Sequence, residues 1–270
     1  MKYGICNETF GDWSLERATR FAAEAGYTGW EVAPFMLTDD IRSFSADDRK
    51  RYRATVEDAG LEVIGLHWLL AKTQGYHLTS TDPSTHVETV AYMEDLIRLC
   101  SDLGGRVMVL GSPQQRNVPE GASMVDAIAA ATVVLQDLVP TLEDCDVSIA
   151  LEPLGPQEGN FLNTAAEGRE LMELVGSDRV RLHLDVKAMS TELDSVPKII
   201  HDHADCTLHF HANDPNMLGP GMGDVDFKPI FRALNAANYT GWVSVEVFDY
   251  SPGVEELVVG SMKNMLAAQQ

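Results

Sequence analysis

Four side chains that could bind a metal ion stand near the ends of four short apolar runs. The runs are ALEPL (150–154), HLDVK (183–187), HFHAND (209–214) and SVEVF (244–248), and the side chains are Glu152, Asp185, His211 and Glu246. Three carboxylates and one imidazole form a mainly oxygen ligand set, which suits Mn²⁺, Mg²⁺ or Co²⁺ and also accepts Zn²⁺ or Fe²⁺. One acid alone is more often a salt bridge or a helix cap. Four such groups, each one strand and one helix apart, predict a single metal site.

The elements that must position these groups are parallel strands joined by helices. Apolar runs alternate with amphipathic stretches along the whole chain. We expect strands at 2–7, 29–34, 61–68, 106–112, 147–154, 180–187, 206–214 and 241–248, and helices at 14–25, 45–59, 84–103, 122–142, 164–175, 192–204, 228–237 and from 253 onward. Helical connections of this length imply right-handed crossovers between parallel strands.

Eight such units predict a (β/α)₈ barrel that forms one domain over residues 1–270. The alternative is a doubly wound open sheet, but no GxGxxG fingerprint follows the first expected strand. The carboxyl ends of barrel strands form the active-site face. The four side chains come from the fifth to eighth strands, which are neighbours, so they can converge on one ion.

Composition argues against several classes of partner, although the acidic charge could also be a solubility feature of solvated helix faces. The formal net charge is −21, and such a field repels nucleic acid and anionic membranes. No apolar run approaches the roughly 20 residues that span a bilayer, and no signal-peptide core follows the start. The four cysteines are scattered without CxxC spacing, which favours free thiols in a reducing compartment. We therefore expect a cytoplasmic protein that acts on a small molecule.

Other polar residues near the expected strand ends are candidates for substrate contacts. Trp68 could form a wall against a sugar face and His67 could bind a hydroxyl, although both could equally be rim packing. His183 and His209 precede two of the acid or histidine positions by two residues, so they point the same way but deeper into the barrel. They are expected to fill the core or to donate to the acids.

Three charged residues lie at or just after the ends of the expected strands. Glu158 stands six residues past Glu152 and could bind a substrate hydroxyl. Lys187 could bring positive charge to the pocket or form a salt bridge at the rim. Arg116 could contact an anion or a keto oxygen, or be a solvated loop residue.

With these motifs the sequence resembles the xylose isomerase-like barrel superfamily, and within it the D-tagatose and D-psicose 3-epimerases. The matching pieces are LEP at Glu152, LD at Asp185, HxH at His211, GDVDF, and VSVE at Glu246. The resemblance covers essentially the whole chain. It implies that these four residues bind one Mn²⁺-type ion, that Glu152 and Glu246 are the acid/base pair, and that Glu158 contacts substrate.

The chain departs from the epimerase pattern at two positions. The epimerases have a histidine three residues after the aspartate, where this chain has Ala188, and an arginine after the histidine, which HANDPNM lacks. Both residues hold substrate oxygens in the epimerases, so the substrate stays open. The endonuclease IV type of the same superfamily needs further histidines for three zinc ions. Neither 109–111 nor Ala188 supplies them, which argues against DNA repair.

The ligand set and the resemblance predict proton transfer next to a carbonyl group. Glu152 or Glu246 would remove the α-proton of a keto sugar or keto-glycoside, and the other carboxylate would return a proton to the cis-enediolate. Return on the opposite face gives epimerisation, and return to the neighbouring carbon gives aldose–ketose isomerisation. A lyase or hydrolase acting on a 3-keto sugar, or an inactive carbohydrate-binding barrel, are the alternatives. Exposed faces of such barrels often pair, so a homo-oligomer also stays open.

Overall fold

Eight parallel strands form a closed barrel in the computed structural model, which describes residues 1–269. Each strand pairs with the next along the chain, and β1 closes the ring by pairing with β8. The strands are β1 (Lys2–Cys6), β2 (Gly29–Val32), β3 (Glu62–Leu66), β4 (Val107–Leu110), β5 (Ser148–Leu151), β6 (Val180–Asp185), β7 (Thr207–Ala212) and β8 (Trp242–Val245). The predicted (β/α)₈ architecture is confirmed; the last residue of the expected domain, Gln270, lies outside the described residues.

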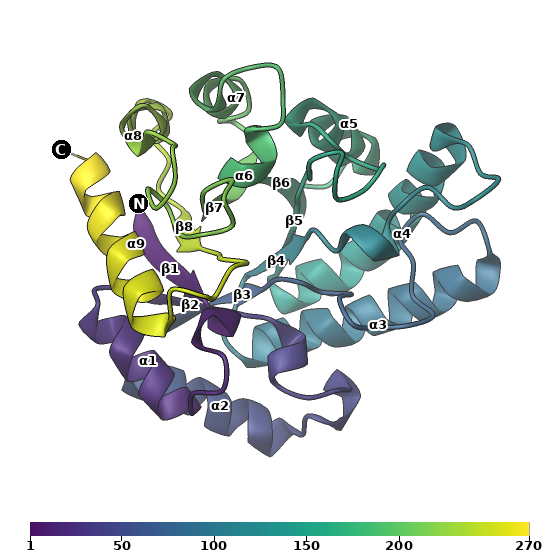
Figure 1. Ribbon diagram of the computed structural model, residues 1–270. Coiled ribbons are helices and arrows are strands. Elements are labelled where there is room, and N and C mark those ends of the chain that lie inside the picture. Colours follow the sequence, from purple (N-terminus) through teal and green to yellow (C-terminus); the bar gives the residue numbers. More distant parts are fainter. Residues whose placement is uncertain (270) are drawn as a thin grey trace.

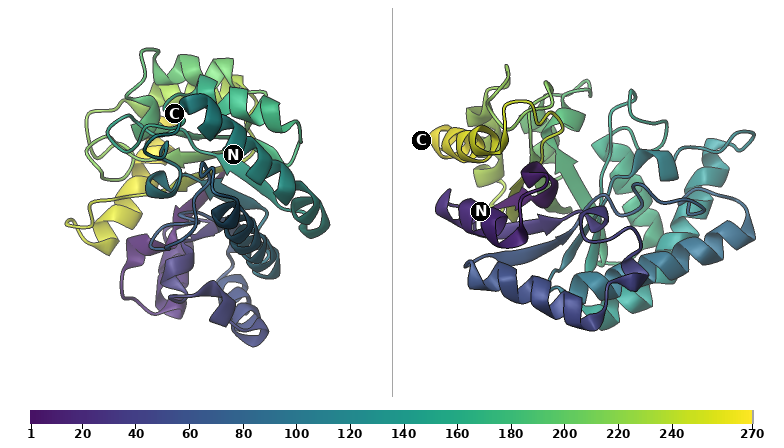
Figure 2. Two further views of the ribbon diagram at one scale, coloured as in Figure 1. Left: turned by 90° about the vertical axis from the view of Figure 1, so that its right-hand side faces the viewer. Right: turned by 60° about the horizontal axis from the view of Figure 1, so that its bottom comes forward.

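The helices surround this barrel (Figure 1), and the two further views in Figure 2 show the same arrangement. They are α1 (Leu15–Glu24), α2 (Ala46–Asp58), α3 (Pro83–Asp102), α4 (Met124–Cys145), α5 (Ala165–Val175), α6 (Val186–Met189), α7 (Val196–Asp202), α8 (Phe227–Ala236) and α9 (Val254–Ala268). Within residues 1–269, four short 3₁₀ helices lie in the loops: η1 (Asn7–Phe10), η2 (Pro34–Met36), η3 (Ile41–Ser43) and η4 (Pro113–Gln115).

Capping residues explain where several helices begin. The side chains of Ser14, Ser45 and Ser123 each accept a hydrogen bond from a backbone N–H in the first turn of α1, α2 and α4. Asp226 does the same for α8. Such capping residues can be recognised in the sequence. The four helices begin within two residues of the positions expected from it.

Two differences from the expected elements occur after β6. The short helix α6 was not expected, and it forms because Asp185 ends the strand and also accepts a hydrogen bond from Ala188 N–H at 2.7 Å. The helix expected at 192–204 is shorter, since α7 begins only at Val196, with Pro197 in its first turn. The strands are also shorter than expected, so several of the polar side chains stand on the first loop residues.

The core has two parts, one on each side of the strands. Most buried apolar side chains pack between the strands and the helices. A smaller cluster of Ile64, Val107, Val109 and Ala150 fills the barrel interior, with Trp242 packed against it. Gly65 lets β3 lie close to β4, because a Cβ at that position would collide with the backbone carbonyl of Val107. The floor of the barrel is therefore apolar, which leaves the polar side chains to the other end.

Helix α4 corrects one expectation about the sequence. It runs through Pro140 to Cys145, and by length and hydropathy it is one helix that could cross a membrane, whereas we expected no run of that kind. In the structure its apolar face packs between α3 and α5, with seven buried side chains. The four cysteines are free, as expected.

Candidate metal centre and active-site cavity

The four predicted ligands lie together at the carboxyl ends of β5 to β8. Asp185 ends β6 and His211 lies in β7, while Glu152 and Glu246 each follow the last residue of β5 and β8. All four residues are buried, and none is more than 7% exposed to solvent. Neighbouring parallel strands bring them to one end of the barrel, as the spacing in the sequence predicts.

His211 is held between two carboxylates. Its Nδ1 lies 3.0 Å from Glu246 Oε2, and its Nε2 lies 3.1 Å from Oε1 of Glu31 on β2. The other oxygen of Glu31 lies 2.9 Å from His209 Nε2. Glu31 is 1% exposed. Glu31 therefore fixes the orientation of the His211 ring, with Nδ1 turned toward Glu246. Carboxylates often orient metal-binding histidines in this way, by a hydrogen bond to the nitrogen that does not face the metal.

His183 is a further buried side chain at this site. Its Nε2 lies 3.7 Å from Glu152 Oε1, and its ring stands edge-on to His211 with 4.2 Å between centroids. Neither ring nitrogen has a hydrogen-bond partner among the described residues. The ligand atoms of Glu152, His183, Asp185 and His211 all lie within 4.8 Å of one another. Glu246 lies outside this compact group. It reaches the group through His211, because its Oε2 lies 3.0 Å from His211 Nδ1.

The acids of this cluster repel one another in a buried setting. Burial raises the pKa of Glu152 to about 8, with Glu246 and Asp185 adding to the shift. Burial, and then Glu246, raise the pKa of Asp185 to about 6. Burial lowers the pKa of His183 well below its usual value, and so do the neighbouring histidines, so His183 is neutral and cannot offset this charge. A divalent cation between the carboxylates would relieve the repulsion.

Asp185 is positioned by hydrogen bonds to both of its oxygens. One oxygen accepts from Ala188 N–H and the other from the side-chain amide of Asn213, which is fully buried. The carbonyl oxygen of the same amide accepts from Lys187 N–H at 2.9 Å. Asn213 therefore joins the end of β7 to the start of α6 and holds the Asp185 carboxylate in place.

Glu152 depends on a glycine and an arginine from the chain after β4. A Cβ at Gly111 would collide with Glu152 Oε2, so a glycine there leaves room for the carboxylate. Arg116 is 2% exposed, and its Nη1 donates to the backbone carbonyls of Leu110 and Glu152. Burial lowers the pKa of Arg116 to about 10. In this structure Arg116 braces the backbone of Glu152, rather than lying in solvent on a loop.

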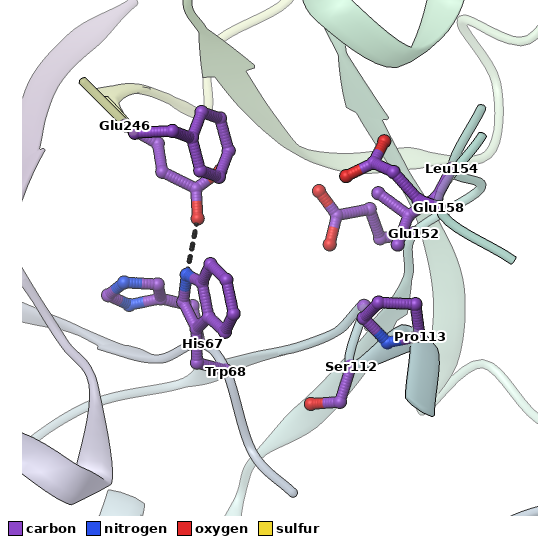
Figure 3. A pocket seen from close by; sticks show the side chains of 10 residues that line it. His67, Trp68, Ser112, Pro113, Glu152, Leu154, Glu158 and Glu246 are labelled. Carbon is purple, nitrogen blue, oxygen red and sulfur yellow. Dashed lines mark hydrogen bonds between the residues drawn. The ribbon is translucent and has the colours of Figure 1, made fainter. Parts of the chain in front are cut away.

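The cavity next to these residues has two acidic sides (Figure 3). Trp68 and Glu246 stand on one side, where the indole Nε1 donates to Glu246 Oε1 at 2.7 Å, and Glu152 and Glu158 stand on the other. Trp68 has a φ of +55°, which is costly for a bulky residue. The Trp68 ring, which was predicted to form a wall against a sugar, thus lines the cavity. Its N–H also holds Glu246, one of the two predicted catalytic acids.

His67 lies beside Trp68 and is buried. Its Nε2 is 2.9 Å from Oε2 of Glu8, which follows β1. Although burial lowers the pKa of His67, charge and hydrogen bonds from Cys6 and Glu8 raise it well above its usual value. His67 lines the cavity, with one nitrogen committed to Glu8.

Glu158 and Lys187 form an ion pair at the far wall. Lys187 Nζ lies 2.8 Å from Glu158 Oε1 and 4.6 Å from the centre of the Phe248 ring. The second oxygen of Glu158 is buried without a partner among the described residues. Glu158 lines the cavity, so that oxygen can accept a hydrogen bond from a bound hydroxyl.

Four residues that shape this site were not among the predicted site residues. Glu31 carried a visible signal, because it is an acid inside the otherwise apolar run GWEV. Asn213 stood in the HAND stretch next to a predicted ligand. Glu8 and Gly111 offered no comparable signal, since their roles depend on contacts across the barrel.

The residues present fit a divalent cation. The centre has carboxylates on neighbouring strands, an imidazole oriented by Glu31, and raised pKa values on two buried acids. Hard cations of the Mn²⁺ or Mg²⁺ type prefer such oxygen-rich sets. The chemistry of these buried side chains therefore suits a divalent ion.

Comparison with known proteins finds one matching family and several similar sugar epimerases. The family described as "Xylose isomerase-like TIM barrel" matches residues 19–268. D-psicose 3-epimerase of Agrobacterium fabrum is 36% identical over 256 residues, which cover 92% of this chain and 85% of the relative. 3-Dehydro-D-guloside 4-epimerase of Escherichia coli is 23% identical over 267 residues, covering 91% and 92%.

A solved structure of a D-psicose 3-epimerase in the presence of D-fructose aligns with a TM-score of 0.85 and 22% identity, covering 99% of this chain and 96% of the other. At this level of identity the match supports the fold.

Proposed function

Because the chain belongs to the xylose isomerase-like TIM barrel family and its relatives are named sugar epimerases, we propose that it is a divalent-metal-dependent epimerase of a keto sugar or keto-glycoside. The observation that carries this proposal is the position of Glu152, Asp185, His211 and Glu246 at the carboxyl ends of neighbouring strands, with Glu152 and Glu246 lining one cavity. The four free cysteines support the further proposal that it works in the cytoplasm.

Four residues of the chain would hold the ion: Glu152, Asp185, Glu246 and Nδ1 of His211. Mn²⁺ is the proposed ion, with Mg²⁺, Co²⁺ and Zn²⁺ as alternatives. When bound, it would supply Lewis-acid stabilisation of the negative charge that develops on the carbonyl oxygen. Glu31 would keep Nε2 of His211 occupied, so that Nδ1 stays aimed at the ion.

Glu152 and Glu246 are proposed as the acid/base pair. They stand on opposite sides of the cavity, so a sugar between them would present one face to each carboxylate. One carboxylate removes the proton α to the carbonyl, and the other delivers a proton to the opposite face of the same carbon. This arrangement favours epimerisation over aldose–ketose isomerisation, and acid–base help of this kind contributes about 10²- to 10⁴-fold.

Glu158 and Trp68 would orient the sugar. The free oxygen of Glu158 is proposed to accept from a substrate hydroxyl, and Lys187 holds the other oxygen of that carboxylate. Trp68 would contact the sugar with its ring while its N–H keeps Glu246 Oε1 in place.

The test is exchange of the α-proton in D₂O, followed by proton NMR. The metal-loaded protein is incubated with free ketohexoses and with methyl 3-keto-glucosides, with and without EDTA. Metal-dependent loss of one C–H signal with formation of the epimer is the expected result. Formation of an unsaturated product would instead identify a lyase, and a protein that binds one equivalent of Mn²⁺ yet exchanges no proton on any compound would contradict the proposal.

A further inference from the structure

A second, larger chamber lies outside the cavity that holds the acids. Its walls come from the loops after β1, β2, β3, β4 and β8. The space between these walls is about 1630 Å³ with its open side included, compared with about 380 Å³ for the inner cavity. Trp68, Ser112, Pro113 and Phe248 line both spaces, so the two chambers share a wall. The inner cavity is lined by the proposed acid/base pair, and the outer chamber lies next to it without a role in the proposed reaction.

Aromatic rings form a row from the inner cavity into the outer chamber. The Phe248 and Trp68 ring centroids are 6.3 Å apart, and those of Trp68 and Phe35 are 6.2 Å apart. Lys72 Nζ lies 3.8 Å from the Phe35 ring centre, and Tyr250 adds a ring that is 46% exposed. Such rings offer flat apolar faces to a ligand, with polar groups around them, which is how proteins bind amphipathic rings.

Two buried polar groups in the wall of this chamber lack partners. Oε1 of Glu8 and Oγ1 of Thr9 are buried and have no hydrogen-bond partner among the described residues. Glu8 is 7% exposed and Thr9 1% exposed, and both line the outer chamber. Unpaired buried polar atoms are costly. A ligand with hydroxyl groups would satisfy them.

The loop after β3 is shaped to present this wall. Trp68 and Lys72 both adopt positive φ angles, +55° and +62°. Each such residue costs of the order of 1–3 kcal/mol and persists where the surroundings enforce it. The two strained residues place one ring at the boundary between the chambers and one ammonium group over Phe35.

From these features we propose that the outer chamber binds a second, uncharged sugar ring, linked glycosidically to the keto sugar in the inner cavity. The proposal rests on the proposed function and narrows its substrate to a keto-disaccharide. The aromatic row provides stacking faces, and Glu8, Thr9 and Gln115 provide partners for hydroxyls. An uncharged ring fits because Glu8 and Asp12 line the chamber together with Lys72, so a ligand of either sign would meet a like charge there.

The experiment compares α-proton exchange by the Mn²⁺-loaded protein on methyl 3-keto-α-glucoside, phenyl 3-keto-α-glucoside and 3-keto-maltose. We expect kcat/KM for 3-keto-maltose to exceed that for the methyl glycoside about tenfold or more, the equivalent of one stacked ring. Phe35→Ala and Tyr250→Ala should each remove most of this preference. Phe44→Ala, which loses a ring that packs on Tyr52 away from both chambers, should retain it, and melting temperatures would show that each variant is folded.

Each outcome decides one of the two claims. Equal kcat/KM for the methyl glycoside and 3-keto-maltose would overturn the second-ring site while leaving the proposed epimerase intact. A preference that survives both Phe35→Ala and Tyr250→Ala, or one shown only by the phenyl glycoside, would also overturn it. Absence of exchange on all three compounds and on free ketohexoses would overturn the proposed function and the second-ring site together.

Discussion

Replacing Glu31 by glutamine should weaken Mn²⁺ binding about 10- to 100-fold, although Glu31 is not itself a proposed ligand. Glu31 uses both oxygens: Oε2 faces His209 and Oε1 faces His211. A glutamine amide can accept with only one of its two terminal atoms, so one imidazole must lose its acceptor. The change also removes a buried negative charge behind His211, and His211 becomes a poorer ligand.

The expected loss corresponds to about 1.4–2.8 kcal/mol of binding free energy. It would be measured by isothermal titration of the metal-free protein with Mn²⁺ at one pH and ionic strength. Glu62→Gln is the matched control, because Glu62 is exposed on β3 and pairs only with Lys2, at 3.1 Å, among the described cations. The Mn²⁺ affinity of the Glu62→Gln protein should stay within about twofold of that of the unchanged protein. A folded Glu31→Gln protein with the same affinity would refute the view that Glu31 orients the metal centre.

Three further predictions concern the acids themselves. Gly111→Ala should slow α-proton exchange about 100-fold, because the added Cβ would displace the Glu152 carboxylate. A near-normal rate would show that the reaction does not depend on the observed position of this carboxylate. Trp68→Phe should lower kcat about tenfold through loss of the N–H donor to Glu246, with Mn²⁺ affinity nearly unchanged, and a lowered affinity alone would point to a different role. In EDTA, unfolding free energy should fall as pH rises from about 5 to about 8, by up to about 1.4 kcal/mol per pH unit for each proton. The reason is that folding raises the pKa of Glu152 to about 8, so the folded state keeps a proton that the unfolded chain releases. Urea unfolding should show this fall in unfolding free energy in EDTA, and saturating Mn²⁺ should abolish it. A flat profile in EDTA would contradict the raised pKa of the buried Glu152 carboxyl.

The features that could be predicted from the sequence are those set by local pattern. A spacing of one strand and one helix places Glu152, Asp185 and Glu246 near the ends of successive strands, and neighbouring strands then bring them together. Helix starts at residues such as Ser14 and Asp226 follow from side-chain caps. Each of these signals depends on a few consecutive residues, so it can be recognised before the fold is known.

The features that could not be predicted depend on contacts between distant segments. Glu31 meets His211 across 180 positions, and Trp68 meets Glu246 across 178. No local pattern states that β2 faces β7 across the barrel. Arg116 shows the same limit, because only the packed structure reveals that its guanidinium turns to the carbonyl of Glu152.

The most direct test of the central claim is a crystal structure of the Mn²⁺-loaded protein with anomalous data at the manganese edge. We predict one anomalous peak, coordinated by Glu152, Asp185, Glu246 and His211 Nδ1, with Glu31 hydrogen-bonded behind the imidazole. A peak coordinated by His183 in place of Glu246, or one between His183, His209 and His211, would contradict the ligand set on which the proposed chemistry rests.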